Sequence, residues 1–230
     1  MRSRTKPAMF MLSMIGVLAA VSVAHANLIT NESFETPLVP AGSFTVFATG
    51  SALIPGWSVG GPAGTGVAIV SGTFSQNGVS FPAQAGSQWL DLTGNGSNST
   101  EGVAQSVATI PGHAYQVSYF IGNTTGGSIF GTTSTVNLLI NGAPAFTDTN
   151  STSSPTTLNW EQFTHTVTAT AGTTALSFLN GDPAGDNSNG LDNVLVLDLG
   201  PASAVPEPAS LVLFGSSLLG LGVIRRRRPK

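Results

Sequence analysis

The 230-residue sequence predicts an all-β protein, an antiparallel jelly-roll β-sandwich flanked by an N-terminal signal helix and a C-terminal transmembrane helix. Three observations support the sandwich. Apolar stretches between residues 27 and 204 are short and alternate with polar residues. Breaks rich in Gly, Asn, Ser and Thr separate many of them. Helical periodicity in this range never exceeds about two turns, which favours a sandwich or barrel.

The first residues have the order of a secretory signal peptide. Three basic residues lie within the first six positions, and the apolar stretch 8–23 follows them. Ala24 and Ala26 then form a small-residue cleavage site. We expect a signal peptide over residues 1–26 with cleavage after Ala26. The alternative, an N-terminal core helix, fits less well because polar turn residues begin abruptly at Asn27.

Alternation predicts the strands of one domain, residues 27–199. The expected strands are 43–48, 67–70, 88–92, 102–108, 115–121, 135–140, 163–170, 175–179 and 191–197. A short linker, 200–205, separates this domain from the C-terminal segment 206–230.

The C-terminal segment combines two prolines, an apolar run and a basic end. The run 209–224 would span roughly 24 Å as a helix, against about 30 Å of hydrocarbon in a bilayer. It leaves no polar face, which a soluble amphipathic helix would show. The basic tail 225–230 belongs on the cytoplasmic side, so we expect the domain to lie outside the membrane.

This C-terminal pattern resembles the PEP-CTERM sorting signal of Gram-negative bacteria. Its residues are Pro206, Glu207, Pro208, Arg225, Arg226, Arg227 and Arg228. The resemblance implies recognition by a membrane-embedded exosortase, removal of the apolar helix, and release or transfer of the domain. Proteins with this signal typically accompany exopolysaccharide production. A permanent single-span anchor is the alternative.

Charge and cysteine content exclude several functions. All eight Lys and Arg lie outside residues 27–204, whereas that range holds every carboxylate except Glu207. Nucleic-acid binding depends on such basic side chains, so nucleic acid is excluded as a partner. The chain has no cysteine, which removes disulfides, thiolate nucleophiles and cysteine-based metal sites. Cations, neutral polymers and sugars remain as ligands.

The domain carries a second resemblance, to galactose-binding-like jelly rolls. These include carbohydrate-binding modules and uncharacterised cell-wall-associated domains of plants and bacteria. The similar segments are LITNESFETP (28–37), IPGW (54–57), QWLDLTG (88–94), GVAQSVATIPGHAYQVSYFIGN (102–123) and GLDNVLV (190–196). The resemblance implies a jelly-roll sandwich, often with one structural calcium ion and, in many members, a glycan ligand.

The resemblance also implies which residues would hold calcium. In related modules a Glu after the first strand and an Asp on the last strand meet across the sandwich, and Glu35 and Asp192 match them. Calcium would need further oxygen ligands that the sequence does not identify. The alternative is that both carboxylates are ordinary hydrogen-bonding groups at strand ends. The loop 181–193 adds Asp182 and Asp186 but lacks the EF-hand order, so a solvated turn is the better reading there.

Trp89 and Asp91 are the candidate glycan-binding residues. They alternate with Leu90, so their side chains lie next to each other on the same face of the expected strand. If the leucines face the core, Trp89 faces an exposed or loop-covered surface, where it can form a sugar platform. The alternative is packing under a loop. Trp57 and Trp160 are expected to pack with the core.

No catalytic motif appears in the sequence. It has no GxSxG elbow, no HExxH and no P-loop. A glycosidase needs two facing carboxylates, and no spacing singles out a pair among Asp91, Glu101, Asp148 and Glu161.

We therefore expect an exported protein that associates non-catalytically with exopolysaccharide or another glycan at the cell surface or in the matrix. Expected partners are the secretion translocon, the inner membrane transiently, and an exosortase. A structural or adhesive matrix protein without glycan specificity is the alternative, and a glycan hydrolase is a weaker one.

Overall fold

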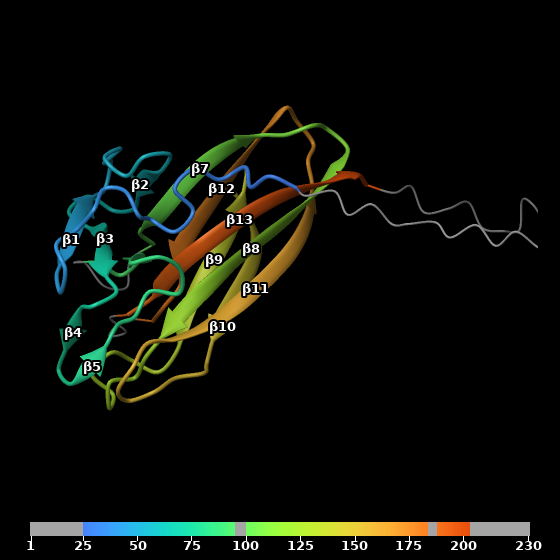
Figure 1. Cartoon of the computed structure of the whole chain (residues 1–230). Coiled ribbons are helices and arrows are strands. Elements are labelled where there is room, and N and C mark those ends of the chain that lie inside the picture. The colour runs from blue at the N-terminus through green and yellow to red at the C-terminus, as the bar shows by residue number, and fades with distance from the viewer. Residues whose placement is uncertain (1–24, 95–99, 184–187, 203–230) are drawn as a thin grey trace, which may run out of the picture.

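The protein folds into a sandwich of two antiparallel sheets (Figure 1). The computed structural model describes residues 25–94, 100–183 and 188–202. The predicted all-β antiparallel sandwich is confirmed. The two expected flanking helices, with Ala24 of the cleavage site and the motif 206–208, lie outside the described residues. Within the described ranges, no helix is long and apolar enough to cross a membrane.

The larger sheet has six strands and the second has five, while a small hairpin forms a third sheet. In spatial order the six-stranded sheet contains β1 (Phe44–Ala48), β3 (Gly66–Ser71), β6 (Gln88–Asp91), β13 (Gly190–Pro201), β8 (His113–Asn123) and β11 (Asn159–Thr168). The five-stranded sheet contains β10 (Ala143–Asn150), β9 (Ser134–Ile140), β12 (Thr173–Asn180), β7 (Gly102–Ala108) and β2 (Ser58–Gly60). The hairpin contains β4 (Ser75–Gln76) and β5 (Val79–Ser80).

Every strand expected from alternation is present, and four further strands appear. Strands β2, β4 and β5 are two or three residues long, too short to show a period. Strand β10 is an edge strand with largely exposed side chains and a proline, Pro144, so its sequence lacks an apolar alternation.

The main core lies between the two sheets and follows the period-2 pattern. On β8, Tyr115, Val117, Tyr119 and Ile121 all point inward and are at most 2% exposed. Trp57 belongs to the same core, as expected, and its ring packs 5.3 Å from Phe34.

A second apolar cluster lies on the outer face of β3 and β6. It contains Ala68, Val70, Val79, Phe81, Trp89, Phe130 and Leu158. The β4–β5 hairpin covers part of this face, and its Asn77–Gly78 turn has φ angles of 52° and 80°. Both angles are positive, as a two-residue type I′ turn requires, and Asn-Gly is the favoured pair for it. The sequence therefore folds a tight hairpin over the outer face of the sheet.

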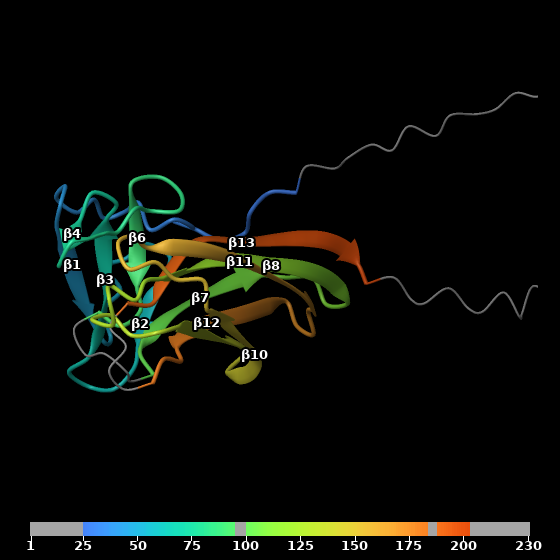
Figure 2. The same ribbon diagram turned by 90° about the horizontal axis from the view of Figure 1, so that it is seen from below.

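The first and last described residues lie at one end of the sandwich. Strands β1, β3 and β4 lie at the opposite end in both views (Figures 1 and 2), and β5 lies beside β4 in Figure 1. Asn27 is fixed to β13 because its Oδ1 accepts the N–H of Val196 at 2.8 Å. The N–H of Leu28 donates to the carbonyl of Val196 at 2.9 Å. The domain therefore begins beside the strand with which it ends.

Candidate functional site

A cavity lies on the outer face of the six-stranded sheet, at the end opposite the first and last described residues. Its volume is about 340 Å³, at the lower end of the range for ligand pockets. Strands β3 and β6 form its floor, and Phe44 of β1, the β4–β5 hairpin and the segment 129–130 surround it. The lining residues are Phe44, Ala68, Val70, Phe74, Gln76, Asn77, Phe81, Trp89, Asp91, Gly94, Ile129 and Phe130.

Trp89 and Asp91 both line this cavity, as their alternation on one strand face predicts. The Trp89 ring is only 1% exposed, so it is not an open platform. Its Nε1–H donates to the carbonyl of Phe81 at 3.1 Å, and the Phe81 and Trp160 rings lie 6.2 and 5.8 Å away. The structure therefore has the loop-covered arrangement, in which Trp89 supports the cavity floor. Trp160 packs against the second apolar cluster, on the outer face of β3 and β6.

Asp91 is a half-buried acceptor held in one orientation. Its Oδ1 accepts the backbone N–H of Thr93 at 2.9 Å and the hydroxyl of Thr93 at 2.7 Å. The N–H of Asn189 lies 3.4 Å from the same oxygen. Burial raises the pKa of Asp91 to about 6, although these donors act in the opposite direction. At neutral pH the cavity floor therefore carries a poorly hydrated carboxylate.

The rim of the cavity presents aromatic and amide side chains. Phe44 is 48% exposed and packs edge-on against Phe74, with ring centroids 5.5 Å apart. Gln76 and Asn77 are exposed on the hairpin. Sequence reasoning missed these four residues, although the Asn-Gly pair signals a hairpin. Only the packing of that hairpin onto β1 and β3 brings them to one opening.

Glu35 and Asp192 lie near each other, but both bind backbone amides. Oε1 of Glu35 accepts the N–H groups of Ser87 and Gln88 at 2.8 and 2.9 Å. Oδ2 of Asp192 accepts those of Gln84 and Ala85 at 2.9 and 3.0 Å. The two carboxylates thus hold the 84–88 segment, which precedes Trp89.

The second oxygens of Glu35 and Asp192 also face donors. The hydroxyl of Ser87 donates to Oε2 at 2.6 Å, and the N–H of Asn193 donates to Oδ1 at 2.7 Å. Burial raises the pKa of Asp192 to about 7, and the negative charge of Glu35 adds to that rise. Calcium requires about six to eight oxygen ligands. Here the carboxylate oxygens face N–H and O–H donors instead of an ion, so the arrangement does not fit calcium. Among the described residues, no group of three or more His, Cys, Asp or Glu could hold a metal.

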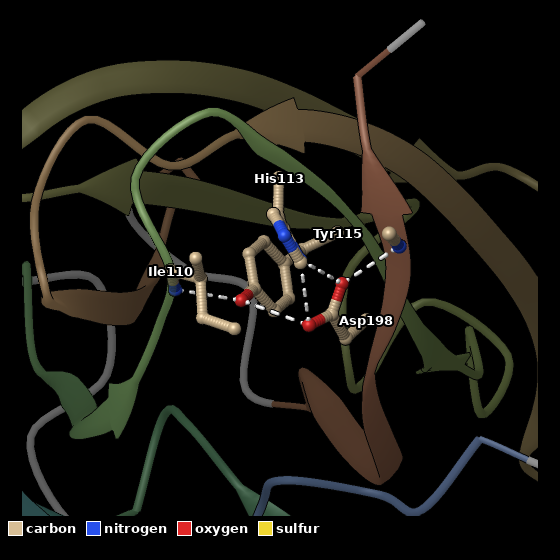
Figure 3. Close-up of polar contacts among 5 residues, drawn as sticks. Ile110, His113, Tyr115 and Asp198 are labelled. Atoms are coloured by element: carbon tan, nitrogen blue, oxygen red, sulfur yellow. Dashed lines mark hydrogen bonds and ion pairs between the residues drawn. The ribbon is translucent and has the colours of Figure 1, made fainter.

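A polar cluster closes the end of β13 onto the start of β8 (Figure 3). Nδ1 of His113 lies 3.0 Å from both carboxylate oxygens of Asp198. The hydroxyl of Tyr115 donates to Asp198 at 3.2 Å and accepts the N–H of Ile110 at 2.8 Å. The N–H of Gly200 donates to Asp198 at 2.7 Å. This backbone donor, followed by His113, lowers the pKa of Asp198.

The other carboxylates considered for a hydrolase lie apart from the cavity. Asp148 accepts the hydroxyl of Tyr119 and lies 2.6 Å from Nε2 of His165, where the edges of the two sheets meet. Glu101 is fully buried, and Glu161 is half-buried on β11. Asp91 is the one acidic side chain among the described residues that line the cavity.

Two family models match the chain. Residues 27–196 match the model described as protein of unknown function DUF642, which covers more than half of the chain. The chain belongs to the DUF642 family. Residues 204–228 match the PEP-CTERM protein-sorting motif, which confirms the resemblance noted for Pro206–Pro208 and the basic tail. This motif implies export, sorting to the cell surface and processing by an exosortase.

Solved structures similar to this DUF642 protein include carbohydrate-binding modules. The CBM22-1 xylan-binding domain of Paenibacillus barcinonensis Xyn10C is 14% identical, with a TM-score of 0.41, over 71% of this chain and 99% of that one. TmCBM61 in complex with β-1,4-galactotriose is 15% identical, with a TM-score of 0.43, over 75% and 99%.

An arabinose-bound α-L-arabinofuranosidase, MgGH51, is 18% identical with a TM-score of 0.46, over 76% of this chain. The DUF642 chain spans only 26% of that enzyme. No curated protein matches the sequence.

Proposed function

We propose that this DUF642 domain binds glycans without catalysis, through the cavity that Trp89 and Asp91 line. The observation that carries the proposal is the joint presence of an aromatic rim and fixed hydrogen-bonding groups at one opening. Sugars present both an apolar face of C–H groups and an edge of hydroxyls, so a site for them needs both kinds of contact.

The aromatic part of the site is Phe44 together with Phe74. Their edge-on contact fixes the Phe44 ring while leaving about half of its side chain exposed. An exposed and already oriented ring loses little conformational freedom when a ligand packs on it.

The polar part consists of Asp91, Gln76 and Asn77. Asp91 accepts hydrogen bonds, and the two amides both donate and accept. Because Thr93 and Asn189 hold Asp91 Oδ1, its orientation is set before a ligand arrives. Charge-assisted hydrogen bonds to such a carboxylate are roughly twice as strong as neutral ones.

A non-catalytic role agrees with the distribution of carboxylates. Glycosidases of the common type place two carboxyl groups on either side of the scissile bond. Among the described residues only Asp91 supplies one to this cavity. Bound sugar would therefore meet a hydrogen-bond acceptor but no second acid or base.

The position of the cavity suits a protein tethered by its C-terminus. The chain enters and leaves the sandwich at the end opposite β1 and β4 (Figures 1 and 2). In our proposal the translocon exports the chain and the signal peptide is removed after Ala26. The apolar segment then holds the protein at the inner membrane until exosortase processing. The cavity would face away from that attachment, toward the polysaccharide of the surface or matrix.

Co-sedimentation with exopolysaccharide from the protein's own host tests the proposal. Phe44→Ser removes the exposed ring of the rim, and Leu53→Ser is a matched control because Leu53 is 74% exposed and does not line the cavity. We expect saturable binding by the unchanged protein and by Leu53→Ser, and at least a tenfold loss for Phe44→Ser. Equal binding by all three would contradict the proposed site. Binding by none would favour a structural or adhesive role.

A further inference from the structure

The cavity has no positive charge to offer a ligand from its own domain. The sequence contains no Lys or Arg between residues 27 and 204. The two histidines in this range, His113 and His165, are each paired with an aspartate away from the cavity. Sites that hold carboxylate or sulfate groups normally use Arg, Lys or several N–H donors.

The floor of the cavity adds a negative charge. Asp91 is half-buried there, two residues after Trp89 on β6 and opposite the apolar Ala68 of β3. A charge in such surroundings interacts more strongly with another charge than it would in bulk water. A uronate or sulfate entering the cavity would lose its hydration and meet Asp91 without a counter-charge. Both effects oppose binding.

Uncharged sugar hydroxyls, in contrast, bind favourably to the same residues. A sugar hydroxyl donates a hydrogen bond to Asp91 and replaces a hydrogen bond from water that the carboxylate lost on burial. Gln76 and Asn77 on the rim exchange hydrogen bonds with further hydroxyls. We infer that the cavity selects uncharged sugars and rejects uronic acids and sulfated sugars, an inference that rests on the proposed glycan-binding function. Selectivity here comes from repulsion of the wrong ligand as well as attraction of the right one.

A matched pair of oligosaccharides tests this inference. Carboxyl reduction of an oligogalacturonide converts each carboxylate to a hydroxymethyl group and keeps length and linkage unchanged. Binding of both sugars is measured by calorimetry at pH 7.5 with protein purified from its host. We expect the reduced sugar to bind at least tenfold more tightly than the unreduced one.

Two variants distinguish the effect of the Asp91 charge on binding from the effect of the Phe44 ring contact. Asp91→Asn removes the negative charge and should shrink the ratio between the two sugars at least threefold. Phe44→Ser removes a ring without changing charge, so it should weaken both sugars and leave the ratio unchanged. Equal or tighter binding of the unreduced sugar would overturn the inference, as would a ratio that Asp91→Asn does not alter. Binding of neither sugar would also overturn it, and the co-sedimentation assay reports separately on glycan binding itself.

Discussion

His113 Nδ1 lies 3.0 Å from the carboxylate of Asp198, and this contact joins the start of β8 to the end of β13. Asp198 also accepts the N–H of Gly200, and the N–H of Ala202 donates to the carbonyl of Gly112. The final described residues are thus held on the sandwich shortly before residue 204, where the match to the sorting motif begins. The folded domain has a fixed exit point for the segment that carries the sorting motif.

Replacing Asp198 should loosen this exit without unfolding the sandwich. Asp198→Asn removes the charge that His113 and Tyr115 bind, so we expect faster hydrogen exchange at Gly200 and Ala202 and unchanged exchange in β8 after Tyr115. Amide exchange followed by mass spectrometry measures this, with Glu161→Gln as a control for loss of one charge. Unchanged protection at Gly200 and Ala202 would show that backbone pairing alone holds the exit.

The same contact should weaken in acid. The pKa of Asp198 is lowered in the folded protein, so its contribution to stability is present above the ordinary pKa of aspartate and is lost as pH falls through the lowered one. Protection of Gly200 and Ala202 should therefore be constant from pH 7 to pH 5 once corrected for intrinsic exchange. It should fall at lower pH. Loss of protection already between pH 7 and pH 5 would contradict this assignment.

Tyr119→Phe should destabilise the fold by about 1.5–3 kcal/mol, the range for hydrogen bonds to charged groups. The Tyr119 ring is fully buried, and its hydroxyl donates to Asp148 where β8 and β10 approach each other. Burial, together with Asp148, raises the pKa of Tyr119, so the hydroxyl is a donor at every ordinary pH. Urea unfolding measures the change. A loss below about 0.5 kcal/mol would mean that His165 alone satisfies Asp148.

Glycan binding should weaken as pH falls through 6. Asp91 has a pKa raised to about 6 by burial and is the one titratable side chain among the described residues lining the cavity. The carboxylate accepts hydroxyl hydrogen bonds more strongly than the acid does, so affinity should drop severalfold between pH 7.5 and pH 5. Calorimetry across this range measures it, and Asp91→Asn should abolish the dependence. A flat profile for the unchanged protein would exclude Asp91 from the contact.

Calcium should leave the melting temperature unchanged. The resemblance to carbohydrate-binding modules predicts an ion at Glu35 and Asp192, but four backbone N–H groups from residues 84–88 occupy these carboxylates. Thermal unfolding with millimolar calcium and with a chelator compares the two cases. A rise of several degrees with calcium would show that the carboxylates release the amides and bind the ion.

The sandwich fold, and the shared face of Trp89 and Asp91 in the cavity, could be predicted from local patterns in the sequence. Alternation through Trp89, Leu90 and Asp91 predicts that the first and third share a face, because side chains on a strand alternate between its two faces. Phe44 and Gln76 could not be assigned in this way. They meet only because a tight hairpin folds back over β1 and β3, and no local period encodes that contact.

The role of Glu35 and Asp192 shows a different limit. Their proximity was expected from the resemblance to related modules, and the charge of Glu35 does act on Asp192. Whether such a pair faces carbonyl oxygens or N–H groups depends on the orientation of four peptide units in the 84–88 segment. Residue identity leaves that orientation open, since every non-proline peptide unit carries both groups.

The most direct test is a map of amide chemical shifts during titration with a neutral oligosaccharide. If the cavity is the glycan site, perturbations should concentrate at Gln76, Asn77, Gly94 and Ile129 and saturate with a single affinity. Asp91→Asn should weaken that affinity. Saturable shifts confined to the opposite sheet, around Ser58 and Gln105, would contradict the account and place the binding surface elsewhere on the sandwich.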